Sequence, residues 1–109
     1  MKYLFALCLF PLPGFAQDTA LTDPTLIATG QQAFLDYCSA CHGEEALGEN
    51  GPDIQGSILK DVTEAVKGID QMPEIWLEDG KPEAIAAFLM SLNPKVAEIK
   101  LRLEAAKQD

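Results

Sequence analysis

The chain has 109 residues, of which 17 are acidic and 8 are basic, so its formal net charge at pH 7 is −9. This length suits one small domain. The acidic balance disfavours binding to nucleic acid or to an anionic membrane surface, because both carry negative charge. We therefore expect no nucleic-acid partner, and a protein that docks onto the chain is expected to present a basic surface.

The first sixteen residues, MKYLFALCLFPLPGFA, have the three parts of a secretory signal. Lys2 gives a positive start, an apolar stretch follows, and a small-x-small sequence ends at Ala16. The apolar stretch is about half of the roughly 20 residues that a membrane-spanning helix needs. We therefore predict a signal peptide over 1–16, cleavage after Ala16, a periplasmic location and no membrane anchor.

Four stretches of the remaining chain carry apolar residues at helical spacing, at about residues 24–40, 57–68, 82–93 and 94–109. Asp23 and Pro24 are typical of a helix start, Ser57 can cap the second helix, and Gly68 can end it. The glycine-rich and proline-containing segments between the first three helices are predicted to be loops. No segment alternates with strand periodicity for long, so the predicted fold is all-α.

Residues 38–42 read CSACH, and the histidine is the only one in the chain. A disulfide would explain the cysteines but not the histidine. A zinc site usually needs four ligands, and the sequence has no second cysteine pair. A thioredoxin-like motif follows a strand in an α/β pattern, which is missing here. Covalent haem attachment uses all three side chains: the thiols of Cys38 and Cys41 add to the haem vinyl groups, and His42 becomes an axial ligand of the iron.

Beyond this motif, the sequence from about residue 25 to 93 resembles the class I c-type cytochromes. The matching residues are Gly30-x-x-x-Phe34, Gly51-Pro52-Asp53-Ile54-x-Gly56, Met72-Pro73 and Ile85-x-x-Phe88-Leu89. The resemblance implies three core helices around one covalently attached haem c, with a cytochrome domain over 17–93 and a C-terminal helical extension over 94–109. It also implies that the carbonyl of Pro52 accepts a hydrogen bond from His42.

Counting the methionines of the chain narrows the candidates for the sixth iron ligand. After signal cleavage two methionines remain, and Met90 follows an apolar face residue of the third predicted helix. Met72 instead lies in a loop and precedes a proline, like the sixth ligand of the resembled family. We therefore predict His42 and Met72 as axial ligands, an arrangement that raises the reduction potential relative to two histidines. Trp76, in the same loop, is predicted to hydrogen-bond a haem propionate or to cover the haem ring.

These expectations describe a periplasmic monohaem c-type cytochrome that carries single electrons and is not an enzyme. Its partners would be haem-attachment machinery and redox proteins that dock through a basic surface onto acidic residues beside the two loops. Two alternatives stay open: an accessory cytochrome dedicated to maturation of, or electron delivery to, one respiratory enzyme, and a haem sensor or enzyme with an open sixth site. The sequence leaves 94–109 open between packing on the third helix and contact with a partner or a second copy.

Overall fold

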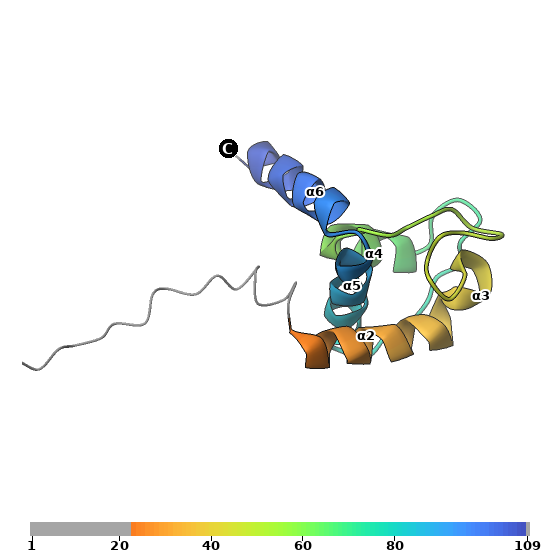
Figure 1. Cartoon of the computed structure of the whole chain (residues 1–109). Helices are drawn as coiled ribbons and strands as arrows, with labels where there is room; N and C mark the ends of the chain where they lie inside the picture. Colours follow the sequence, from red (N-terminus) through yellow and green to blue (C-terminus); the bar gives the residue numbers. More distant parts are fainter. Residues whose placement is uncertain (1–22, 109) are drawn as a thin grey trace, which may run out of the picture.

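The structure is a computed structural model, and it describes residues 23–108. The predicted signal peptide and its cleavage site lie outside the described residues. Within residues 23–108 all regular secondary-structure elements are helices (Figure 1). The only β-bridge in this range is an isolated one between Ile69 and Met72. The helices are α2 (Pro24–Tyr37), α3 (Ser39–His42), α4 (Leu59–Val66), α5 (Lys81–Leu92) and α6 (Pro94–Lys107). The predicted all-α fold is confirmed, and it is consistent with a small cytochrome c-like fold.

The longest of these helices, α2 and α6, have 14 residues each. A helix needs roughly 20 mainly apolar residues to cross a bilayer. Accordingly, no helix in the described part of the chain has both the length and the apolar content of a membrane span.

The first predicted helix is divided in two. It begins as expected, because the Asp23 carboxylate accepts hydrogen bonds from the N–H groups of Thr25 and Leu26 at 3.0 and 3.3 Å. Instead of continuing to residue 40, however, α2 ends at Tyr37. Cys38 turns the backbone out of the helix, with φ −122° and ψ −32°, and the short helix α3 then carries the rest of the CSACH sequence.

The second predicted helix starts later than expected, and Ser57 is not its cap. Helix α4 begins at Leu59 with Ile58 in the N-cap position. The Asp61 carboxylate accepts a hydrogen bond from the Ile58 N–H at 3.0 Å, which gives a partner to an N–H group near the helix start. The predicted end is confirmed, since Gly68 follows the helix with a φ of +97° that favours glycine.

The core is centred on α5, where residues 84–90 are all buried. Helix α5 lies between α2 and α4 (Figure 1), and it packs on both. Where α2 crosses α5, a Cβ atom on Gly30 would lie 1.8 Å from the carbonyl oxygen of Ala84, so only glycine permits this approach. Beside the crossing, the rings of Phe34 and Phe88 pack with their centroids 5.3 Å apart.

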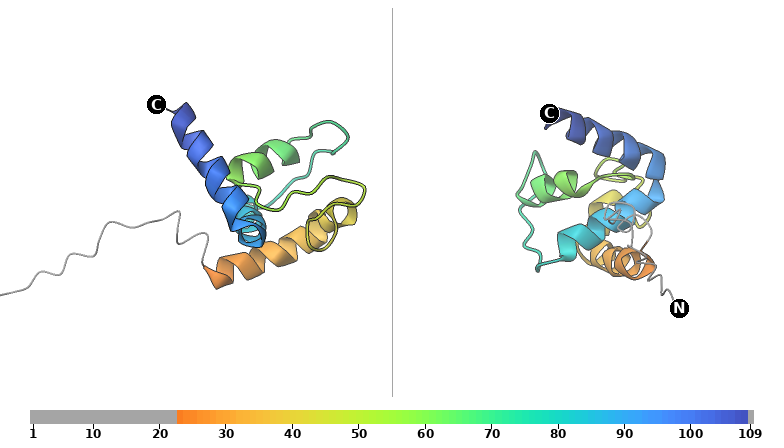
Figure 2. Two further views of the ribbon diagram at one scale, coloured as in Figure 1. Left: turned by 45° about the horizontal axis from the view of Figure 1, so that its top comes forward. Right: turned by 90° about the vertical axis from the view of Figure 1, so that its left-hand side faces the viewer.

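The predicted C-terminal helical extension is present as α6, and the structure shows how it is held against the other helices. Ala97 is fully buried, and Val96 packs so closely on Gly56 that a Cβ atom there would lie 2.7 Å from the valine Cγ1. Two ion pairs also join α4 to α6: Lys60–Glu104 at 3.1 Å and Lys100–Asp61 at 3.0 Å. Figure 2 shows α6 on the outside of the described chain, with its C-terminal end farthest from α5.

Candidate functional site

His42 ends the short helix α3, and its backbone is fixed from both sides. Its N–H donates a hydrogen bond to the carbonyl of Cys38 at 3.1 Å, and its own carbonyl accepts one from the N–H of Gly48 at 2.8 Å. The residue is buried, with 9% of its surface exposed. A histidine held in this way has a defined position before any ligand binds.

The imidazole of His42 is also fixed in orientation. Its Nδ1 lies 2.8 Å from the carbonyl oxygen of Pro52. A carbonyl oxygen can only accept a hydrogen bond, so the proton of the neutral ring is on Nδ1. The lone pair is therefore on Nε2, which is the arrangement of a histidine that binds a metal through Nε2 and is oriented through Nδ1.

Gly51 allows the loop that carries Pro52 to pass directly against this ring. A Cβ atom at position 51 would lie 2.9 Å from Cε1 and 3.0 Å from Nδ1 of His42. The N–H of Gly51 also donates a hydrogen bond to the carbonyl of Cys41 at 2.7 Å. Gly51 was predicted only as part of the family pattern, and its contact with His42 supplies a physical reason for a glycine there.

Cys38 and Cys41 are one helical turn apart, joined by a hydrogen bond of 3.3 Å from the Cys41 N–H to the Cys38 carbonyl. Both are free thiols; Cys41 is exposed and Cys38 is half-buried. Burial raises the pKa of the Cys38 thiol to about 11. Without a bound ligand, burial therefore keeps Cys38 in its thiol form at neutral pH.

Two residues that the sequence analysis did not single out hold this loop closed. The carbonyl of Ala46, a buried residue with a φ of +61°, accepts a hydrogen bond from the N–H of Ile54 at 2.9 Å. The side-chain amide of Gln55 donates to the carbonyl of Glu45 at 2.8 Å. Neither residue has a local sequence signal, since Gln55 occupies a variable position of the matched pattern and Ala46 has a conformation unusual for alanine.

The segment that carries Met72 and Trp76 is a separate loop, between α4 and α5. It is attached to the end of α4 by a hydrogen bond from the Ile75 N–H to the Val66 carbonyl at 2.8 Å. Met72 is half-buried, whereas 78% of Trp76 is exposed. The structure thus brings His42 and Pro52 into contact, while the roles of Met72 and Trp76 stay predictions.

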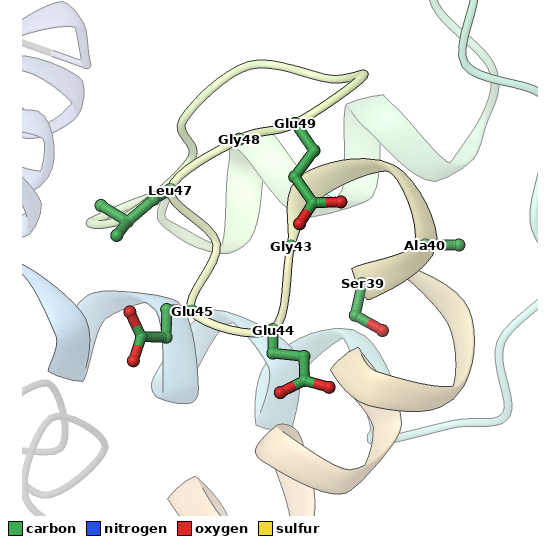
Figure 3. A pocket seen from close by; sticks show the side chains of 8 residues that line it. All are labelled: Ser39, Ala40, Gly43, Glu44, Glu45, Leu47, Gly48 and Glu49. Carbon is green, nitrogen blue, oxygen red and sulfur yellow. The ribbon is translucent and has the colours of Figure 1, made fainter.

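A pocket of about 620 Å³ lies beside the CSACH turn (Figure 3). It is lined by Ser39, Ala40, Gly43, Glu44, Glu45, Leu47, Gly48 and Glu49. None of the predicted haem residues lines it, so we do not assign this pocket to the haem. Among residues 23–108, no group of three or more histidine, cysteine, aspartate or glutamate side chains could hold a metal ion.

The charges are distributed unevenly along the fold. All six charged residues between positions 23 and 59 are acidic: Asp23, Asp36, Glu44, Glu45, Glu49 and Asp53. Four of the eight basic residues of the chain are in α6: Lys95, Lys100, Arg102 and Lys107. Helices α3 and α6 lie on opposite sides of the described chain (Figure 1). The end that carries the CSACH turn is therefore acidic, and the basic residues are concentrated at the far end.

Comparison with curated proteins finds a similarity to the Cbb3-type cytochrome c oxidase subunit FixPc of Rhizobium leguminosarum bv. viciae. The identity is 42% over 40 residues, which cover 34% of this chain and 14% of that subunit. No family model and no solved structure matches the chain. The similarity supports a c-type cytochrome with covalently bound haem, and no finer class.

The residues of the site fit such a cofactor. The thiols of Cys38 and Cys41 are free, are one turn apart and directly precede the histidine. The ring of His42 is oriented by Pro52 through Nδ1, which leaves Nε2 for an iron ion. The absence of a side chain at Gly51 is what lets the loop contact this ring. Cys38, Cys41 and His42 would therefore hold the haem.

Proposed function

We propose that this chain is a monohaem class I c-type cytochrome that carries single electrons in the periplasm, with His42 and Met72 as the axial iron ligands. The observation that supports it most is the 2.8 Å contact between His42 Nδ1 and the Pro52 carbonyl, next to two free thiols. A disulfide or a dithiol redox site would give no reason for a buried, oriented histidine at this position.

When bound, a haem would supply a one-electron couple between ferric and ferrous iron. The chain's own residues would do the rest. Cys38 and Cys41 would hold the haem through two thioether bonds, and the Pro52 carbonyl would make the His42 ring a stronger donor by accepting its Nδ1 proton in a hydrogen bond. The thioether of Met72 would raise the reduction potential relative to a second histidine. No substrate bond is made or broken, so the proposed function is not enzymatic.

The acidic residues at the CSACH end support a partner of opposite charge. The carboxylates of Glu44, Glu45 and Glu49 surround the loop that follows the histidine (Figure 3). Complementary charge steers two proteins together in the correct orientation, and salt weakens this attraction. We therefore propose redox partners with a basic docking surface at this end, and periplasmic machinery that attaches the haem.

A second candidate function is favoured by the similarity to an oxidase subunit. The matched protein is named as a subunit of a cbb3-type cytochrome c oxidase. In this second function, the chain would be an accessory cytochrome that delivers electrons to one respiratory enzyme or serves the maturation of that enzyme. Electron exchange of the haem-loaded chain with one respiratory enzyme of its host, and with no other, would favour this role over that of a general carrier.

The proposed axial ligation is tested by replacing Met72 with leucine, which keeps an apolar side chain but removes the thioether. The reduction potential of the haem-loaded protein is expected to fall by on the order of tenths of a volt, within the range that axial ligands set. The matched control is Met90→Leu, because Met90 is buried in α5 and a swap of similar volume is well tolerated there. Equal reduction potentials for the two variants and the wild type would show that Met72 does not bind the iron.

A further inference from the structure

Helix α6 presents an apolar stripe to solvent on the side opposite its buried contact. Ala97, on the inner side, is fully buried, whereas Ile99 and Leu103 are 52% and 57% exposed. These two residues are four positions apart and so lie above one another on one face, and Ala106 continues the same row. We call Ile99, Leu103 and Ala106 the apolar stripe of α6.

Both borders of this stripe are basic. At 3.6 residues per turn, Lys95 and Arg102 lie along one border, and Lys100 and Lys107 lie along the other. In a heptad description, the stripe occupies the seam and these four residues occupy the flanking e and g positions. The helix's acidic side chains, Glu98 and Glu104, lie farther around the helix. An apolar ridge between two basic rows is thus a property of α6 itself.

The ion pairs of these basic residues do not prevent other contacts. Arg102 pairs with Glu98 at 2.6 Å, Lys107 with Glu104 at 3.2 Å, and Lys100 with Asp61 at 3.0 Å. The two pairs within α6 are surface pairs, which contribute little to stability because water screens them and long side chains must be ordered, whereas the Lys100–Asp61 pair to α4 is part-buried. The exposed cations Lys95, Arg102 and Lys107 can therefore turn to carboxylates of a partner without a large loss of stability.

We propose that this face of α6 docks an amphipathic helix of another protein whose apolar stripe is bordered by acidic residues. A ridge with large apolar side chains one turn apart fits between the side chains of a facing helix. Acidic residues at the partner's flanking positions would meet the four basic residues of α6. Because Ile99 and Leu103 are exposed on the side of α6 opposite the buried Ala97, this face has room for the partner.

Charge argues against the two other occupants of such a face. A second copy would place basic rows against basic rows in a parallel as well as in an antiparallel pairing, which is unfavourable. An anionic membrane would attract α6 but repel the chain as a whole, whose formal net charge is −9. A stripe with only two large apolar side chains also buries little surface in a bilayer.

This interface goes beyond the proposed electron transfer and does not depend on it. Because α6 lies on the opposite side from α3, a partner on α6 would leave the CSACH end uncovered. The chain could then stay attached to one protein through α6 while its acidic end meets another.

The test uses haem-loaded full-length protein and a fluorescent synthetic helix with leucine at the seam and glutamate at the flanking positions. Saturable binding is expected, measured by fluorescence anisotropy. The Ile99→Ser/Leu103→Ser variant should bind about tenfold more weakly or worse, because two side chains no longer bury apolar surface. The matched control is Leu35→Ser, which removes an exposed leucine of α2 and should leave the affinity unchanged.

Charge is tested with a second probe in which lysine replaces glutamate at the flanking positions. The wild type should prefer the glutamate helix, and Lys95→Glu/Arg102→Glu should reduce or reverse this preference. Because all four substituted residues are exposed, the variants are expected to keep the wild-type circular dichroism spectrum. The proposal is wrong if the wild type binds neither helix or both equally. It is also wrong if the serine variant instead loses self-association in sedimentation velocity or binding to phosphatidylglycerol vesicles.

Discussion

Replacing both Cys38 and Cys41 with serine is expected to abolish covalent haem attachment. A thioether bond needs a sulfur atom, and the described structure gives each cysteine a free thiol beside the oriented His42. After denaturation and gel electrophoresis, haem staining should be strong for the wild type and absent for the double variant. Each single variant keeps one thiol and should retain haem through one bond, with a lower yield of loaded protein.

The control for this experiment is Ala40→Ser, which adds a hydroxyl group between the two cysteines at an exposed position. It changes the polarity of the motif but neither thiol, so its haem staining should equal that of the wild type. Haem that stayed on the denatured double variant would contradict attachment through these cysteines. Equal loss in Ala40→Ser would show that the assay reports disruption of α3 and not the loss of sulfur.

A second large effect is expected from Gly30→Ala. The added Cβ atom would lie 1.8 Å from the carbonyl oxygen and 2.4 Å from the carbonyl carbon of Ala84. Both are backbone atoms of α5, so the clash cannot be relieved by a side-chain rotation. The two helices must separate, and the packing of Phe34 on Phe88 beside the crossing is lost. We expect the free energy of unfolding to fall by about 3 kcal/mol or more.

Denaturant unfolding of the haem-loaded protein, followed by circular dichroism, measures this effect. Thr29→Ala is the matched control, because Thr29 is the exposed neighbour of Gly30 in α2. Its free energy of unfolding should stay within about 0.5 kcal/mol of the wild type. If Gly30→Ala unfolded at the same denaturant concentration as Thr29→Ala, the close helix crossing would be refuted.

The helices could be predicted because their signals are local. Periodic apolar residues located α2, α4, α5 and α6, and the capping of α2 by Asp23 follows from neighbouring residues. The break at Cys38 could not be predicted, since apolar spacing continues through it and the turn is held by contacts with a later loop. The predicted start of α4 was wrong by one residue, since Ile58 and not Ser57 is at the N-cap, and the Asp61 carboxylate accepts the hydrogen bond from its N–H.

The candidate site was predictable to a different degree at each residue. The CSACH motif predicts covalent haem attachment through its two cysteines and its histidine. The resemblance to a family predicted the contact of Pro52 with His42, and the Pro52 carbonyl oxygen lies 2.8 Å from His42 Nδ1. The hydrogen bond from the Gln55 side chain to the Glu45 carbonyl joins two segments of the loop that are ten residues apart, so no local sequence pattern predicts it. Met72 and Trp76 lie on a loop whose position is set by long-range packing, and their roles therefore remain predictions.

Whether both axial positions of a covalently bound haem are filled is tested most directly by one spectrum. The absorption of the reduced, haem-loaded protein is recorded before and after addition of carbon monoxide, which binds ferrous haem iron at an open or labile position. With His42 and Met72 on the iron, we expect an unchanged spectrum, as for an electron carrier. A prompt spectral shift would contradict this ligation and would favour a haem sensor or enzyme with an open sixth site.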